Sequence, residues 1–258
     1  MNKKLFFLFF LVTALVTTLF IGCDDSGNST TGPTTGGNPN IDLKAGSIFY
    51  YNTDSISQNG TIHHTAWLTK DSVVGTTTYP PSGGRTCWQI NSVTNDTSII
   101  PVQITSSTLY VSYDSQSGQL YQWGVKQLFD PNQTASWDLL ADFSKALGTS
   151  VSLFTITNLF GQSFLTADVS STVQYDTTIT SNGSHVGVNC YKVAAVADIK
   201  ASGLSVGKAY MDYFVGYTPS SNTSNPSGMV RIKLYPVSIP TLPGVEGADQ
   251  FLNRFRIP

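Results

Sequence analysis

A Gly-x-Ser-x-Gly motif at residues 203–207 is a short pattern in this chain that could carry covalent chemistry. Such a motif places a nucleophilic serine on a sharp turn between a strand and a helix, with a histidine later in the chain as the base. Ser205 is followed by an alternating aromatic segment that predicts a strand, and no histidine follows it. We therefore expect a glycine-bounded turn at Ser205 and no enzymatic activity.

Residues that could bind a metal are sparse and badly spaced. His63 and His64 are adjacent on a predicted strand, where neighbouring side chains point to opposite faces, and His185 is distant in sequence. The segment from Asp130 begins like a calcium loop, but it lacks the loop's glycine and has Ala141 at the twelfth position. We expect no metal and no cofactor.

The first 23 residues have the layout of a secretory signal. Two lysines precede an apolar run, Leu5–Ile21, that ends at Gly22 and Cys23. Residues 19–23 (Leu-Phe-Ile-Gly-Cys) resemble the bacterial lipobox, with Phe20 where the family prefers leucine. The resemblance implies cleavage before Cys23 and lipidation of Cys23, which makes the membrane a partner. The alternative is an uncleaved helix, since the apolar run is at the short edge of the roughly 17–25 residues that span a bilayer.

The lipobox resemblance divides the chain into three parts. Residues 1–22 are the signal peptide, residues 23–40 are the lipidated cysteine with a Ser/Thr/Gly/Pro tether, and residues 41–258 are the body. Such a tether holds the body roughly 20–25 Å from the membrane on average. The implied location is the bacterial envelope, at the periplasmic face or the cell surface, with the outer membrane favoured over the inner.

Composition excludes one class of partner and favours one class of fold. Without residues 1–22 the chain has 12 basic against 16 acidic side chains, so a nucleic-acid partner is not expected. Glu246 is the single glutamate, whereas Ser, Thr, Val, Tyr and Phe are plentiful, which is β composition.

After Cys23, the remaining cysteines are Cys87 and Cys190. In an exported protein this pair predicts a disulfide; two buried free thiols are the alternative.

Strand patterns recur through the body. Period-2 alternation is clearest from Leu165 to Tyr175 and from Val230 to Leu234. In the earlier part of the body, strand-like segments are separated by turn residues at 58–60, 80–84, 95–96 and 115–118. The predicted strands there are Ser47–Thr53, Thr61–Thr69, Ser72–Thr78, Thr86–Val93, Ser98–Ile104, Thr108–Tyr113 and Gln119–Trp123.

One short helix is predicted over Trp137–Leu147. Asp138 lies in its first turn, apolar residues follow at helical spacing, and Gly148 stands where a C-terminal glycine belongs.

Two segments on either side of this predicted helix look alike. Residues 84–90 and 187–193 both fit Gly-x-x-Cys-[Trp/Tyr]-x-[Ile/Val], and residues 109–113 resemble residues 209–213. The sequence therefore predicts two similar β-meander halves, 41–135 and 145–240. Chance similarity between polar and aromatic hairpins is the alternative.

Aromatic side chains are abundant on the predicted strands and occupy both faces of several. They could pack in a core or line a ligand surface, because a sheet that is apolar on both faces must be covered on both. The candidate ligand-lining aromatics are Trp67, Trp88, Tyr110, Tyr113, Trp123, Tyr210, Tyr213 and Phe214.

These features predict an all-β, mainly antiparallel fold, a large curved sheet or half-barrel of two similar meanders with one intervening short helix. In pattern, residues 41–258 resemble the lipoprotein-carrier half-barrels of the bacterial envelope. The resemblance implies a non-enzymatic lipoprotein that binds a lipid, acyl or glycan ligand in its concave face. The alternative is a structural or accessory lipoprotein that contacts an envelope protein and has no small-molecule site.

Overall fold

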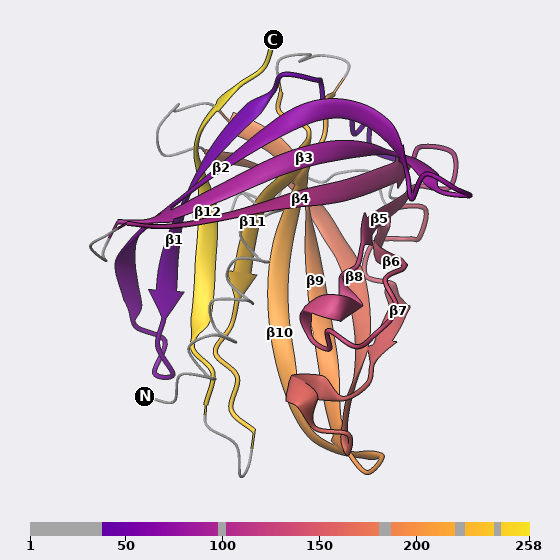
Figure 1. Ribbon diagram of the computed structural model, residues 1–258, viewed down its shortest axis with the longest axis vertical. Helices are drawn as coiled ribbons and strands as arrows, with labels where there is room; N and C mark the ends of the chain where they lie inside the picture. The colour runs from indigo at the N-terminus through magenta and orange to yellow at the C-terminus, as the bar shows by residue number, and fades with distance from the viewer. Residues whose placement is uncertain (1–37, 98–101, 181–186, 220–224, 240–243) are drawn as a thin grey trace.

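The computed structural model describes residues 38–97, 102–180, 187–219, 225–239 and 244–258 (Figure 1). The signal segment, Cys23, the tether up to residue 37, and His185 lie outside the described residues. No helix within the described residues is long and apolar enough to span a membrane.

Twelve strands form one antiparallel sheet, with only two short 3₁₀ helices, η1 (Lys126–Leu128) and η2 (Leu159–Gly161), among the described residues. The strands are β1 (Ile48–Ile56), β2 (Ile62–Tyr79), β3 (Arg85–Asp96), β4 (Gln103–Asp114), β5 (Gln119–Trp123), β6 (Trp137–Asp142), β7 (Ser150–Ile156), β8 (Leu165–Thr180), β9 (Gly187–Ala201), β10 (Leu204–Gly216), β11 (Gly228–Leu234) and β12 (Gly247–Arg256).

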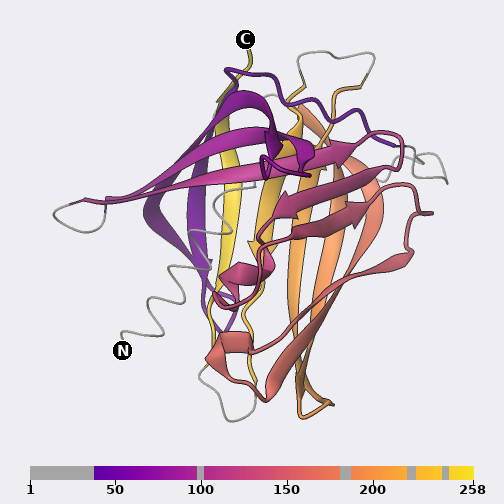
Figure 2. The same ribbon diagram turned by 45° about the vertical axis from the view of Figure 1, so that its right-hand side comes forward.

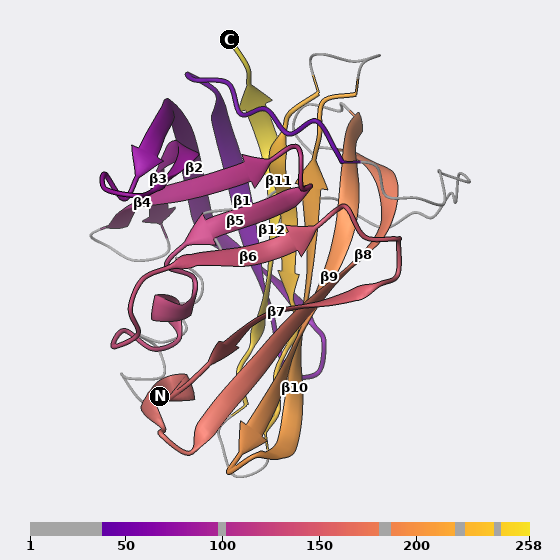
Figure 3. The ribbon, with the colours of Figure 1, turned by 90° about the vertical axis from the view of Figure 1, so that its right-hand side faces the viewer.

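The sheet curls into a nearly closed barrel. Its strand order is β6-β5-β4-β3-β2-β1-β12-β11-β10-β9-β8-β7, so the first strand pairs with the last. β6 and β7 are the two ends of the sheet; they come together without a hydrogen-bonded ladder and leave a seam (Figure 3). The predicted all-β antiparallel fold is confirmed, and the curvature goes beyond a half-barrel.

The predicted helix over Trp137–Leu147 is wrong. Its first part is strand β6, and the rest is a turn. Leu140 is an extra residue in the pairing of β6 with β5, and this bulge breaks the strict alternation so that the apolar spacing imitates a helix. The helix-end signals serve turns: Asp142 accepts a hydrogen bond from the Ser144 N–H at 3.0 Å, and Gly148 has φ of +83°.

Strand boundaries follow the turn residues only in part. β5 agrees with the prediction over Gln119–Trp123. The predicted strands Thr61–Thr69 and Ser72–Thr78 form one long strand, β2, whose register shifts between Val73 and Gly75. Residues 95–96, predicted as a turn, continue β3.

The two halves of the sheet, β1–β6 and β7–β12, begin in the same way. Gly46 before β1 and Gly148 before β7 each have φ of +83°. Each donates its N–H at 2.8 Å to a carbonyl on the second strand of its half, Val73 and Val173 respectively. The register of that second strand then shifts in both halves. Two six-stranded meanders of matching geometry therefore build the sheet, and their origin by duplication stays a prediction.

Cys87 and Cys190 occupy matching places in the two meanders. Cys87 lies opposite Thr77 on β2, and Cys190 lies opposite Thr177 on β8. Both are buried, and no disulfide joins them, so the structure lacks the expected disulfide. The reason is topological: their strands, β3 and β9, are not neighbours in the sheet. The predicted match of residues 109–113 with residues 209–213 is displaced by four residues. Ile90 and Val193 are equivalent, and they pair with Leu109 and Tyr213 respectively, so Leu109 corresponds to Tyr213 rather than to Ala209.

The N-terminal segment of the described chain crosses one end of the barrel (Figure 2). Ile41 and Leu43 are buried there against the main core. The Asn38 side chain donates hydrogen bonds to the Ser115 carbonyl at 2.9 Å and the Gln116 carbonyl at 3.1 Å, on the β4–β5 turn. Gly118 in this turn has φ of +69°, a backbone conformation that favours glycine. The segment thereby fastens the end of the tether to the barrel.

Leu252→Ala tests the contribution of the β1–β12 closure to stability. Leu252 on β12 is 1% exposed, and its truncation should lower the free energy of unfolding by about 2.5–5 kcal/mol. Leu204→Ala, at a position 75% exposed, is the matched control and should change the free energy by less than about 0.5 kcal/mol. Urea unfolding measures both, and equal effects would contradict the assigned closure.

Alkylation tests the two thiols. Burial raises the pKa of the Cys87 thiol, and Cys190 is fully buried, so iodoacetamide should react slowly with both at neutral pH. In urea, without reductant, both should be alkylated, as read by peptide mass spectrometry. A disulfide would leave neither thiol available in urea.

Candidate ligand-binding site

An apolar cavity of about 160 Å³ lies inside the barrel behind the seam. β8, β9 and β10 form one side of it, while β6, β7, η2 and the β5–β6 loop that carries η1 form the other. Apart from Tyr210 and Tyr213, the side chains that line it are aliphatic, phenyl or thioether groups. They include Phe129, Leu140, Phe154, Ile156, Ala167, Val169, Ala195, Ala197, Ala209 and Leu234.

Alanines on neighbouring strands make the space. Ala197 on β9 pairs with Val169 on β8 and with Ala209 on β10, and Ala195 lies two residues away on the same face. Because cross-strand neighbours have Cβ atoms about 5 Å apart, small side chains in adjacent rows leave volume that no chain atom fills. These alanines were not predicted as site residues. The signal for them in the sequence is the alternation of Ala195 and Ala197, which puts two small side chains on one face of the strand.

The matching positions of the first half are polar. Val73 and Val173 precede equivalent register shifts in the two halves, so positions can be matched by counting from them. The cross-strand row Val169–Ala197–Ala209 of the second half then corresponds to the row Thr69–Thr94–Thr105 of the first. The hydroxyls of Thr69 and Thr94 lie 3.0 Å apart, within hydrogen-bond distance. Two meanders of the same geometry therefore present different chemistry to the barrel interior.

Hydrogen bonds fasten the β5–β6 loop over the cavity. The Asn158 amide donates to the Asp130 carboxylate at 3.1 Å, and the Gln133 amide donates to the Thr157 hydroxyl at 2.8 Å. The Asn158 bond and the Asn132 N–H lower the pKa of Asp130, which is buried and ionised. The Asp130 carboxylate therefore accepts hydrogen bonds from the protein, whereas in a calcium loop it would coordinate the metal. No group of three His, Cys, Asp or Glu residues in the described chain could hold a metal ion.

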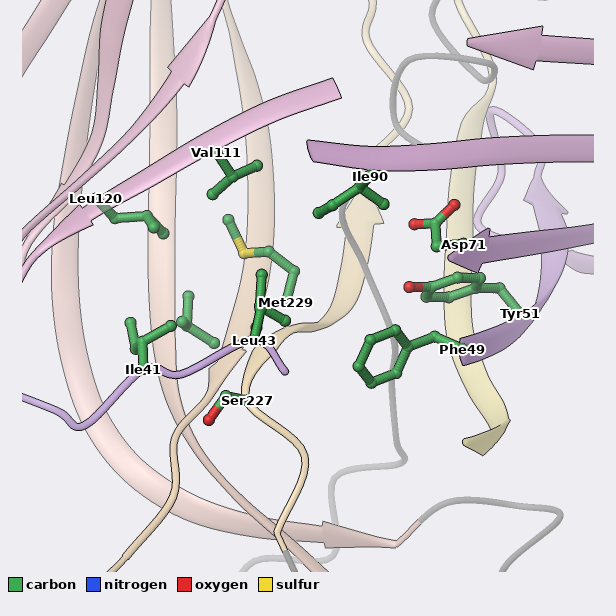
Figure 4. A pocket seen from close by; sticks show the side chains of 12 residues that line it. Ile41, Leu43, Phe49, Tyr51, Asp71, Ile90, Val111, Leu120, Ser227 and Met229 are labelled. Atoms are coloured by element: carbon green, nitrogen blue, oxygen red, sulfur yellow. The ribbon is translucent and has the colours of Figure 1, made fainter. Parts of the chain in front are cut away.

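A second, smaller cavity of about 30 Å³ lies between the first half, the N-terminal segment and residues of β10 and β11 (Figure 4). Its lining is apolar except for Tyr51, Asp71 and Ser227. Burial raises the pKa of Asp71 to about 8, although the nearby hydroxyls of Ser92 and Tyr51 oppose the shift. The Tyr51 pKa is raised as well, by burial and by Asp71. Asp71 is therefore a neutral carboxylic acid at neutral pH.

Among the aromatics predicted to line a ligand surface, the structure brings Tyr210 and Tyr213 to the larger cavity. Tyr213 is buried, and its hydroxyl donates to the Leu140 carbonyl on β6, across the interior from β10. Trp88 and Tyr113 pack against the main core instead, the latter edge-on to Phe143.

The other predicted aromatics lie apart from both cavities. Tyr110 stacks on Tyr79 with ring centres 3.7 Å apart, and Trp123 meets Tyr79 edge-on. Arg231 lies 6.0 Å from the centre of the buried Phe214 ring. Trp67 is half-buried on β2, opposite Thr53.

Among the described residues weighed for catalysis, Ser205 on β10 and the two histidines of β2 lie on strands that are not neighbours in the sheet. Ser205 lies at the start of β10, just after the β9–β10 turn, and its hydroxyl donates to Asp198 at 2.6 Å. The turn glycine before it, Gly203, has φ of +86°. His63 is exposed, and His64 lies 3.0 Å from the Asp54 carboxylate on the neighbouring strand.

Comparisons with solved structures found two neighbours at low identity. One, from Parabacteroides distasonis, is provisionally described as a lipoprotein; it is 12% identical, with a TM-score of 0.45, over 84% of this chain and 97% of its own. The other, from Bacteroides fragilis, is provisionally described as an exported protein with a YmcC-like fold; it is 13% identical, with a TM-score of 0.44, over 85% of this chain and 100% of its own. No model of a known protein family and no curated protein matches the chain.

Asp71→Asn tests the buried carboxylic acid. The folded state keeps Asp71 protonated up to a pKa of about 8, whereas the unfolded chain ionises near 3.8. Between these values the unfolded state binds fewer protons, so Asp71 makes the protein less stable as pH rises.

The free energy of unfolding of Asp71→Asn relative to wild type should therefore increase from pH 5 to pH 8, by at most about 1.4 kcal/mol per pH unit, and level off above pH 8. Urea unfolding at pH 5, 6.5, 8 and 9 measures the trend. Asp198→Asn, on the β9 strand next to the β9–β10 turn, is the control, and a pH-independent difference for Asp71→Asn would contradict the buried neutral acid.

Proposed function

We propose that this protein is an exported envelope lipoprotein, anchored through Cys23, that binds a hydrophobic ligand inside its barrel without catalysing a reaction. The apolar cavity beside the seam is the observation that carries the proposal. Its lining offers hydrocarbon contact and almost no hydrogen-bonding groups, which favours an acyl or other lipid group over a glycan. The lipobox resemblance of residues 19–23 supports the anchoring.

The size of the cavity supports a binding role on energetic grounds. Protein interiors are normally close-packed, and unfilled volume costs about 24 cal/mol per Å³, or about 4 kcal/mol for 160 Å³. An apolar cavity of about 150 Å³ accepts a benzene ring. This volume therefore suits a group of about six carbons, or the end of a longer chain.

The seam supplies a route to the cavity. β6 and β7 are not joined by a ladder, and the β5–β6 loop that covers this region is fastened to the β7–η2 connection by side-chain hydrogen bonds. Hydrogen bonds at the surface exchange readily with water, so this loop is the weakest part of the cavity wall. The ligand enters by displacing it.

A second role, as an accessory lipoprotein that contacts an envelope protein, is favoured by a different surface. Leu68 on β2 and Ile104 on β4 both flank Asn95 on β3, and Ile104 is 69% exposed. Val74, further along β2, is also exposed. Exposed apolar side chains gathered on one sheet face are typical of protein contacts.

Native mass spectrometry of the mature chain tests the binding proposal. The chain from Asp24 to Pro258, exported to a bacterial periplasm without lipidation and purified without detergent, should carry added mass that organic extraction removes. Ala197→Phe should lose that mass, because the new ring fills the cavity. Ala194→Phe, three residues earlier on β9, where alternation turns the side chain to the other face, should keep it.

Benzene provides a check that does not depend on the natural ligand. The wild-type chain should bind it, as measured by calorimetry, and Ala197→Phe should not. A wild-type chain with a bare mass and no benzene binding would overturn the ligand-binding role and favour the accessory one.

A further inference from the structure

The inner face of the first half carries buried polar side chains, some of whose hydrogen-bonding atoms lack partners. We call Thr53, Asp71, Ser92 and Gln250 the inner polar wall. Thr53 and Gln250 are 0% exposed, and Asp71 and Ser92 are 2% exposed. Among the described residues, Thr53 Oγ1, Gln250 Oε1 and Gln250 Nε2 have no hydrogen-bond partner, whereas Asp71 interacts with the hydroxyls of Ser92 and Tyr51.

The members of the inner polar wall form two pairs on four adjacent strands, β3, β2, β1 and β12, and share one face. Thr53 on β1 pairs directly with Gln250 on β12, and Asp71 on β2 pairs directly with Ser92 on β3. Asp71 also lies opposite Phe49, which is on the same face of β1 as Thr53. Figure 4 shows Asp71 turned to the interior beside Tyr51 and Phe49.

Buried polar atoms in folded proteins are nearly always hydrogen-bonded, because an unsatisfied one keeps the full cost of its lost hydration. Three such atoms on two directly paired residues therefore call for a partner. The small cavity at Asp71, about 30 Å³, has room for about one water molecule and serves only one of the four residues. The inner polar wall therefore needs polar partners from outside the chain.

A row of paired residues joins the inner polar wall to the apolar cavity. Tyr213, which lines the cavity, pairs with Ile232 on β11; Ile232 pairs with Gln250, and Gln250 pairs with Thr53. With strands about 4.8 Å apart, Gln250 lies about 10 Å from Tyr213 across the sheet. One elongated molecule can thus contact the apolar cavity with one end and the wall with the other.

The charges around this row suit an uncharged group. Arg231 lies on the opposite face of β11 from Ile232 by alternation, where it holds Asp249 through two hydrogen bonds of 2.8 and 2.6 Å. Arg254 of β12 lies over the Tyr50 ring. An anionic ligand group beside the Asp71 carboxyl would have no cation to balance its charge. Hydroxyl and amide groups, in contrast, can both donate hydrogen bonds to and accept them from carboxyl, hydroxyl and amide side chains.

We propose that the inner polar wall binds the uncharged, hydroxyl- or amide-bearing head group of the same molecule whose hydrocarbon end occupies the apolar cavity. The ligand class is then a neutral amphiphile. This inference rests on the proposed hydrocarbon binding and adds the chemistry of the head group.

Three probes with one tail separate the head groups. Octanamide and octyl glucoside are neutral, octanoate is anionic, and all three are titrated into the mature chain by calorimetry below their micelle concentrations at pH 7. We expect both neutral probes to bind at least tenfold more tightly than octanoate. Benzene, which has no head group, reports on the apolar cavity alone.

Gln250→Leu tests the wall directly. It should bring the affinity for octanamide to within about threefold of that for octanoate while leaving benzene affinity unchanged. Thr53→Val, at the position paired with Gln250, should act in the same direction and is the second variant if Gln250→Leu folds poorly. Gln174→Leu, the same chemical change at an exposed position on β8, should change neither.

The outcomes separate the two proposals. If wild type binds benzene but binds octanoate as tightly as octanamide, the head-group inference is overturned and hydrocarbon binding stands. The inference also fails if Gln250→Leu and Thr53→Val fold but keep the full preference. If wild type has a bare mass and does not bind benzene, both proposals fall.

Discussion

The pairing of β1 with β12 is the contact on which the rest of the structure depends. It joins the first strand of one meander to the last strand of the other, so that two six-stranded units enclose one interior. Separated, each meander would expose a strand edge and an apolar face to water. Leu252, at the centre of this pairing, is buried in the main core, while the Arg231–Asp249 ion pair lies on the outer side of β11 and β12.

The enclosed interior is filled unevenly. Near the barrel end crossed by the N-terminal segment, large side chains of both meanders pack into one core. Elsewhere on the inner face, the second meander presents Ala195 and Ala197 where the first presents the hydroxyls of Ser92 and Thr94 at matching register positions. Neither choice is what stability alone would select, because the first leaves volume unfilled and the second buries polar groups. Both departures occur on one continuous inner surface, which is why we relate them to one ligand.

Sequence patterns predict most of this fold and little of the site. Period-2 alternation and glycine turns suffice for β5, β8 and β11, because these signals are local. They fail at residues 137–147, where the bulge at Leu140 gives helical spacing to a strand, and at Val73, where a register shift continues a strand that the pattern divides. The cavity could not be predicted, since it requires Ala197 to lie beside Ala209, and that register is set by distant turns. The aromatics were the more visible signal, yet only Tyr210 and Tyr213 reach the cavity.

The hydrogen bonds of Asn38 to the β4–β5 turn have a consequence for orientation. They fix the point at which the tether leaves the barrel, at the end opposite η2 and the β9–β10 hairpin (Figure 2). If Cys23 carries the anchor, the protein hangs from its densely packed end, and the end with the cavity points into the aqueous space. Under the proposed binding role, the ligand would then be exchanged on the side of the protein that faces away from its own bilayer.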